Sequence, residues 1–183
     1  MNRLRFRQTR DKGARLARGS SSIDLGEPSR GKQSLEGTIP MDIWMLIAKA
    51  LVSLVAIATA LGGALADLVI PATAKQHMSN PHWPPHAKFH NGQTISLGVF
   101  LGLLALWFLW SPGGDQRVQF HLGVIVAALY WLSMLGASIL PGTRWVDPEF
   151  AKETSTILGM PPQMFLMFVL LTSLIISEIL HMF

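Results

Sequence analysis

The 183-residue chain contains no cysteine, which excludes disulfide bonds, thiolate nucleophiles and cysteine-ligated metal centres. Charge is also scarce, because 14% of the residues are Asp, Glu, Lys or Arg whereas 50% are hydrophobic. The helices of a soluble bundle need charged outer faces. This composition therefore favours a membrane protein over a soluble one.

Common catalytic signatures are absent as well. The sequence has no HExxH zinc motif, no phosphate-binding loop, no nucleophile elbow and no dinucleotide-binding fingerprint. No class of enzyme is therefore indicated by a motif, and any chemistry must come from side chains that the fold brings together.

Four apolar stretches come close to the length of about 20 residues that a helix needs to cross a bilayer. They cover about residues 44–66, 94–110, 118–140 and 164–182. Breakers at residues 111–115 predict that spans two and three form an antiparallel hairpin. We therefore expect an all-α, integral membrane four-helix bundle.

Two features inside the spans predict how the helices pack. Small residues allow helices to approach closely in lipid, and they occur at Ala56, Ala60, Gly63, Ala64, Gly98 and Gly102. Ionisable side chains within spans are expensive to expose to lipid. We expect Glu178 and His121 either to extend to the membrane surface or to pair and tie two helices together.

The first 40 residues are basic, with nine Lys or Arg against four Asp or Glu. Such a segment buries too little apolar surface to order itself, so we expect a disordered tail at residues 1–40 and a transmembrane domain at residues 41–183. Alternatively, Met41 is the true start, because it directly precedes the first span. The tail lacks the folded surface and interleaved aromatic residues of a specific nucleic-acid binder.

Four spans put both termini on one side of a cell membrane. The basic tail and Arg117 favour the cytoplasmic side for them, which makes the loops at residues 67–94 and 141–163 external. The expected partners are the lipid bilayer and either a larger membrane assembly or further copies of the chain.

Four of the six histidines lie within fourteen residues, between His77 and His90. If a helix begins at Pro84-Pro85 and runs into span two, His86 and His90 share one face with Gln93. Such a pair can hold zinc or iron once a further ligand is supplied. The candidate binding residues are Asp67, His77, His82, Trp83, His86, His90 and Gln93, with His86 and His90 as the metal ligands.

Three interpretations of this segment stay open. Trp83 and Phe89 could simply anchor the loop among lipid headgroups, the histidines could bind a metal, or they could form a metal-free pocket that binds a ligand or transfers protons. The second external loop mixes charge and aromatic residues at 144–150. It is either a solvated turn or a lid in which Asp147 or Glu149 supplies a carboxylate.

The chain reads NPHWPPHAKFH at residues 80–90 and NGQT at residues 91–94. This run resembles the signature of a family of small four-span membrane proteins of unknown function from bacteria and fungi. Weaker matches involve Asp67 with His77, and residues 141–143 with residues 146–148. The resemblance covers about residues 43–182. It implies a compact four-helix membrane domain and no established activity.

Together these features predict a small multi-pass membrane protein whose His-rich external segment binds a ligand, metal or partner. The alternative is a membrane-embedded enzyme that acts on a lipid-soluble substrate. In that case His86 and His90 would serve as metal ligands or as acid and base groups.

Overall fold

The computed structural model of the protein describes residues 42–183, so the predicted tail and the question of Met41 lie outside it. The described elements are α1 (Asp42–Ala64), the π-helical turn η1 (Leu65–Val69), α2 (Pro71–Ala74), α3 (Pro85–Trp110), α4 (Gln116–Ala137) and α5 (Pro162–His181). Within these residues, β-type pairing is limited to an isolated bridge between Ile157 and Met160. The expected all-α fold class is confirmed.

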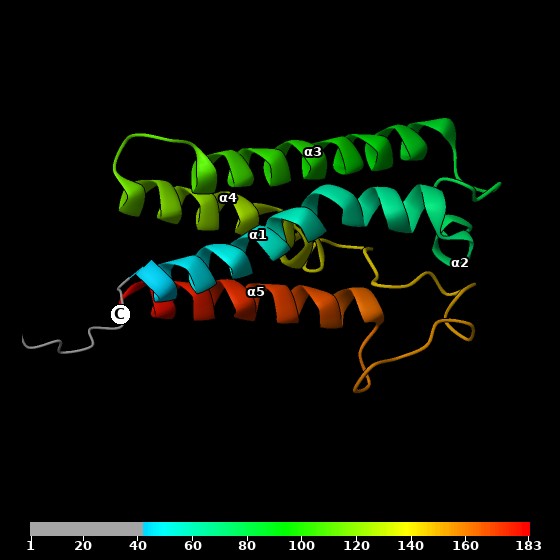
Figure 1. Ribbon diagram of the computed structural model, residues 1–183. Helices are drawn as coiled ribbons and strands as arrows, with labels where there is room; N and C mark the ends of the chain where they lie inside the picture. The colour runs from blue at the N-terminus through cyan, green and yellow to red at the C-terminus, as the bar shows by residue number, and fades with distance from the viewer. Residues whose placement is uncertain (1–41) are drawn as a thin grey trace, which may run out of the picture. The chain divides into compact units, whose positions relative to one another are not determined.

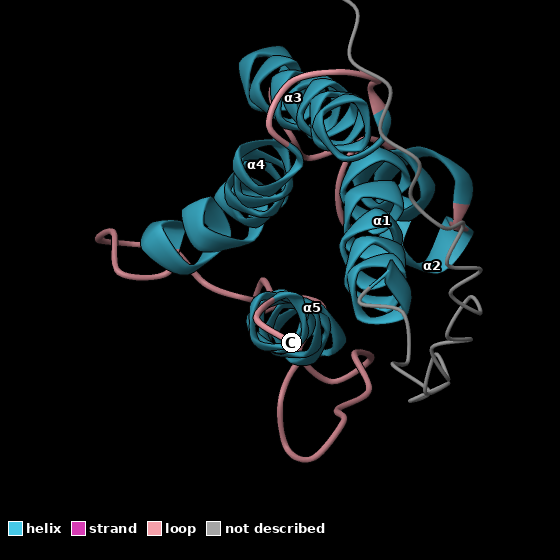
Figure 2. Cartoon of the chain, turned by 60° about the vertical axis from the view of Figure 1, so that its left-hand side comes forward, coloured by secondary structure: helices cyan, strands magenta, loops and turns pink. Residues whose placement is uncertain are grey.

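Four helical segments of the described chain are long and apolar enough to cross a membrane: Ile43–Val69, Pro85–Trp110, Gln116–Ala137 and Pro162–His181. They run alongside one another in Figure 1. α1 packs against the other three long helices, and α4 packs against α3 and α5. Figure 2 shows these helices from a second direction, grouped around a common interior. This is the predicted four-helix arrangement.

The helix bounds differ from the apolar stretches at several ends, and two of these differences have a clear cause. α3 begins at Pro85 instead of residue 94, because proline fits the first turn of a helix, where its missing N–H is not needed. The helix therefore carries the polar residues 86–94 as its first turns. α4 ends at Ala137 instead of residue 140, just before the Pro141-Gly142 turn. Hydrophobicity indicates which residues lie in lipid, whereas the proline and glycine residues determine where the helices begin and end.

The predicted hairpin between α3 and α4 is confirmed. Asp115 closes it, because its side chain accepts hydrogen bonds from the backbone N–H groups of Arg117 and Val118 at the start of α4. Gly113 and Gly114 precede it with φ values of 87° and 73°, which other residues rarely adopt. A cap of this kind contributes about 1 kcal/mol.

The small residues bring α1 and α3 into close contact, as predicted. A β-carbon at Gly102 would lie 2.4 Å from the carbonyl oxygen of Ala56, and one at Gly98 would lie 2.8 Å from that of Thr59. Both distances are too short for any side chain. The two helices therefore pack backbone against backbone at these positions.

The outer surface of the bundle is apolar. Leu54, Phe100 and Ile175, on three different helices, are each more than 60% exposed. Large exposed apolar surfaces are unfavourable in water and mark contact with lipid or protein. The exposed apolar side chains and the apolar spans agree, and the chain is a membrane protein.

Candidate functional site at one end of the bundle

The candidate site lies where the loop after α2 faces the end of α4 and the start of α5. Its first residue, Asp67, lies in η1, where the backbone N–H of Ile70 bonds to the carbonyl of Leu65 at 2.8 Å. This hydrogen bond spans five residues instead of four and so widens the helix within a single turn, a distortion often found at functional sites. Asp67 is 9% exposed, so its carboxylate needs a partner inside the protein.

His77 supplies that partner. Its Nδ1 atom lies 2.9 Å from Asp67 Oδ1 and 3.1 Å from the backbone oxygen of Thr73. Both partners are acceptors, so Nδ1 carries the proton and Nε2 is the ring atom that can accept one. The hydrogen bond to Asp67 raises the pKa of His77 above its ordinary value of 6.5, although partial burial opposes this; Asp147 adds a smaller raising effect.

Trp83 and Asn80 hold this loop in shape. The Trp83 ring meets the His77 ring edge to face at 5.6 Å. Asn80, 1% exposed, accepts a hydrogen bond from the backbone N–H of His82 at 2.8 Å and donates one to Glu149 Oε1 at 3.2 Å. The first loop is therefore braced both internally and against the second loop, which lies between α4 and α5.

The second loop lies against the first, as the lid hypothesis required. Besides the Asn80–Glu149 hydrogen bond, Lys75 Nζ and Glu153 Oε2 form an exposed ion pair at 2.6 Å. Glu149 therefore bonds an asparagine of the first loop, not a histidine. Asp147 influences His77 only through its charge.

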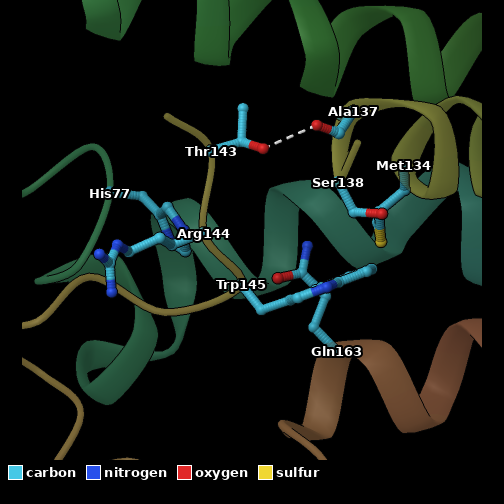
Figure 3. A pocket seen from close by; sticks show the side chains of 8 residues that line it. All are labelled: His77, Met134, Ala137, Ser138, Thr143, Arg144, Trp145 and Gln163. Carbon is cyan, nitrogen blue, oxygen red and sulfur yellow. Dashed lines mark hydrogen bonds between the residues drawn. The ribbon is translucent and has the colours of Figure 1, made fainter. Parts of the chain in front are cut away.

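A cavity of about 240 Å³ lies beside His77. Its lining combines apolar, hydroxyl, amide and cationic side chains, contributed by His77, Met134, Ala137, Ser138, Thr143, Arg144, Trp145 and Gln163. Figure 3 draws His77 and Arg144 on one side and Trp145 with Gln163 on the other. The Thr143 hydroxyl donates to the carbonyl of Ala137 at 2.8 Å, which joins the loop to the end of α4.

Three of the predicted site residues lie elsewhere, on the exposed face of the first turns of α3. His90 Nε2 is 3.1 Å from His86 Nε2, and His90 Nδ1 is 3.3 Å from Gln93 Oε1. With Gln93 as acceptor, the His90 Nδ1 atom is protonated, and the His86 Nε2 proton is donated to His90. These side chains form a short hydrogen-bonded chain that does not line the cavity.

The sequence-predicted residues thus divide into two groups. Asp67 and Trp83 contact His77, which lines the cavity, whereas His86, His90 and Gln93 form the chain on α3. His82 contributes only a backbone hydrogen bond, and its side chain is exposed. No three His, Asp or Glu side chains among residues 42–183 are arranged to hold a metal ion, so the pair on α3 has no third ligand there.

Sequence reasoning missed much of the cavity lining. Arg144 and Trp145 lie in the segment whose mixture of charge and aromatic residues was noted, so a weak signal existed for them. Thr143 belongs to the weaker family match at residues 141–143, which gave it no role. Ser138 and Gln163 gave no signal, because a hydroxyl or amide at the end of a span is ordinary at a membrane surface.

A second polar cluster lies between α4 and α5. His121 Nδ1 is 2.9 Å from Glu178 Oε2, and the rings of His121 and His181 are 5.2 Å apart. The predicted Glu178–His121 pair is therefore present and ties the two helices together. It is distinct from the cavity beside His77.

The four apolar helices and the polar end of the bundle define a small multi-pass membrane protein. The chain belongs to a family of unknown function, DUF6640, whose model matches residues 51–170. The matched region includes Asp67, His77 and the His-rich segment. No curated protein and no solved structure matches the chain.

Proposed function

We propose that this membrane protein binds a small ligand in the cavity beside His77, at the membrane surface. The observation that carries the proposal is the Asp67–His77 pair, a buried carboxylate that orients a half-buried imidazole next to a cavity. Headgroup anchoring alone would require neither the π-helical turn nor the buried charge.

The lining of the cavity supports ligand binding. Small-molecule sites combine an apolar wall with a few convergent polar groups. Met134 and Trp145 provide such a wall here, and Ser138 and Gln163 provide hydrogen-bonding groups. In this proposal the cavity faces the external side, because the basic tail and Arg117 favour the cytoplasm for the opposite end.

A second candidate function is enzymatic. Asp67 holds the Nδ1 proton of His77, which prepares Nε2 to act as a general base toward a ligand in the cavity. The His86–His90–Gln93 chain supports a separate role in proton transfer at the surface. The Asp67–His77 pair favours His77 over His86 and His90 as the acid–base group.

The absence of cysteine allows a direct test. In a Ser138→Cys variant the new thiol is the only one in the chain and lies in the cavity wall. Its alkylation by N-ethylmaleimide is measured on the full chain in native membranes and again after detergent purification. We expect alkylation to be several-fold faster after purification removes the ligand, and to slow again when an extract of the host membranes is added.

Ser155→Cys is the matched control, because Ser155 is exposed in the second loop and does not line the cavity. Its alkylation should be equal in all three conditions. Adding His77→Gln to Ser138→Cys should remove the protection. If Ser138→Cys reacts equally in all three conditions, the cavity holds no ligand and the proposal is wrong.

A further inference from the structure

We infer that the cavity beside His77 takes an amphiphile with an anionic head, of the fatty-acid carboxylate class. This inference rests on the proposed function and names the chemistry of its ligand. It is carried by the position of Arg144 on the cavity wall and by the apolar side chains that connect the opposite wall to the core.

The cationic side of the cavity is formed by Arg144 and His77. The ion pairs of the described chain are Lys75–Glu153, His77–Asp67 and His121–Glu178, so within residues 42–183 Arg144 has no carboxylate partner. A guanidinium binds a carboxylate through two parallel N–H donors. Arg144 is exposed beside the cavity that it lines, so its guanidinium is available to an anion bound there.

Two nearby carboxylates do not cancel this preference. Asp67 is hydrogen-bonded to His77, and Asp147 acts on His77 only at a distance. Neither lines the cavity. An anionic head in the cavity is therefore attracted by Arg144 and can bond to the His77 ring, whereas a cationic head would be repelled by the guanidinium.

The opposite side of the cavity combines the Gln163 amide with apolar side chains that border the core. Trp145 packs against the hydrophobic core, and Met134 also contacts it. Gln163 is spaced four and seven residues before Met167 and Leu170, so it shares their core-facing side of α5. An apolar tail entering between Trp145 and Gln163 is thus directed toward the bundle interior, while its head stays beside Arg144.

Alkylation of Ser138→Cys tests the inference with three probes on the full chain in neutral detergent. Dodecanoate has an anionic head and an apolar tail, acetate has the same head without the tail, and dodecanol has the same tail with a neutral hydroxyl head. We expect dodecanoate to protect the thiol, and Arg144→Gln to raise the dodecanoate concentration needed by about tenfold, since a charge-assisted bond is lost. Uptake of dodecanoate by micelles is common to all variants and leaves this comparison unaffected.

Lys152→Gln is the matched control, because Lys152 is an exposed cation of the same loop that does not line the cavity. It should leave the dodecanoate concentration needed for protection within twofold of that for the parent Ser138→Cys protein. Arg144→Lys keeps the charge and should raise the dodecanoate concentration needed for protection less than Arg144→Gln does. Each rate is normalised to the same variant without probe, which removes any effect of charge on the thiol.

The remaining outcomes overturn the inference in distinguishable ways. Equal protection by dodecanol and dodecanoate, unchanged by Arg144→Gln, would retain a ligand site but refute the anionic head. Protection by acetate at the same concentration as dodecanoate would refute the amphiphile. Failure of all three probes, where the membrane extract does protect, would refute the ligand class alone. Failure of the extract as well would refute the proposed function.

Discussion

Nδ1 of His77 lies 2.9 Å from Oδ1 of Asp67, which joins the loop after α2 to the last turn of the first membrane helix. The carboxylate is buried and the imidazole borders a cavity. The pair therefore links the fold to the candidate site. The same hydrogen bond positions the loop and occupies Nδ1, which leaves Nε2 as the ring nitrogen that can accept a proton.

The first prediction concerns the titration of His77. Because the hydrogen bond to Asp67 raises the pKa of His77, Asp67→Asn should lower it. The measurement is an NMR titration of histidine-labelled protein in detergent. An unchanged pKa of His77 in Asp67→Asn would show that the hydrogen bond to Asp67 is not the cause.

The sign of the stability effect follows from the raised pKa. The stabilisation from the protonated His77–Asp67 pair is fully present below pH 6.5, the ordinary pKa, and is lost as pH rises through the raised pKa. The difference in thermal stability between wild type and Asp67→Asn should thus be largest at low pH. A difference that grows as pH rises through that window would contradict this account.

The second prediction concerns the α1–α3 contact. Gly102→Ala should destabilise the protein by about 1–3 kcal/mol, because the added carbon meets the backbone of Ala56 and forces the helices apart. Gly92→Ala, on the same helix, has nothing within 4 Å and should be neutral or slightly stabilising. Thermal unfolding in detergent measures both. Equal stability of the two variants would refute the close approach.

The fold was largely predictable because lipid imposes strong rules on sequence. Span length and hydrophobicity predict the four helices, and small residues predict where α1 and α3 approach. The ends were partly predictable: the sequence offered Pro84-Pro85 as a helix start, and Pro85 does begin α3, whereas hydrophobicity alone placed that start near residue 94. The π-helical turn at Leu65–Val69 leaves no sequence pattern, because it depends on how Asp67 satisfies its carboxylate after folding.

The site was only partly predictable, for a related reason. Composition pointed to the His-rich segment, but periodicity alone could not tell which histidines face inward. His86 and His90 share a helix face as predicted, yet that face is exposed. Asp67 and His77 were both candidates, but their direct contact is set by the fold. Arg144 is distant in sequence, and only the tertiary structure places it at the same cavity as His77.

The third prediction concerns a buried hydrogen bond inside the bundle. The indole N–H of Trp131 donates to the Thr59 hydroxyl at 2.8 Å, and both residues are buried. Thr59→Val should cost about 0.5–2 kcal/mol, because it keeps the shape but leaves the N–H unpaired. In a Trp131→Phe background the same change should cost almost nothing. An equal cost in both backgrounds would mean that the hydrogen bond is not the cause.

The fourth prediction concerns metal at the α3 histidines. His86 and His90 offer two nitrogens 3.1 Å apart, and no third His, Asp or Glu joins them in residues 42–183. Added zinc should therefore bind weakly and be removed by gel filtration. His86→Ala/His90→Ala should abolish this weak binding and His82→Ala should not. Zinc or iron retained near one equivalent through purification, and lost in the double variant, would contradict the prediction.

The final prediction compares the two contacts that hold the second loop against the first. Glu149→Ala removes the acceptor of the nearly fully buried Asn80 side chain and leaves that donor unpaired, which costs about 1–3 kcal/mol. Glu153→Ala breaks only the ion pair with Lys75, whose partners are 52% and 60% exposed, and such pairs contribute about 0–1 kcal/mol.

Glu149→Ala should therefore loosen the loop that carries Arg144 and Trp145, whereas Glu153→Ala should not. The measurement is amide hydrogen exchange across residues 141–161, together with alkylation of Ser138→Cys in each background. We expect faster exchange and faster alkylation with Glu149→Ala alone. If the two variants behave alike, the buried asparagine does not hold the loop, and the wall of the cavity must be fixed instead by the Thr143 hydrogen bond to Ala137 and by the packing of Trp145 on the core.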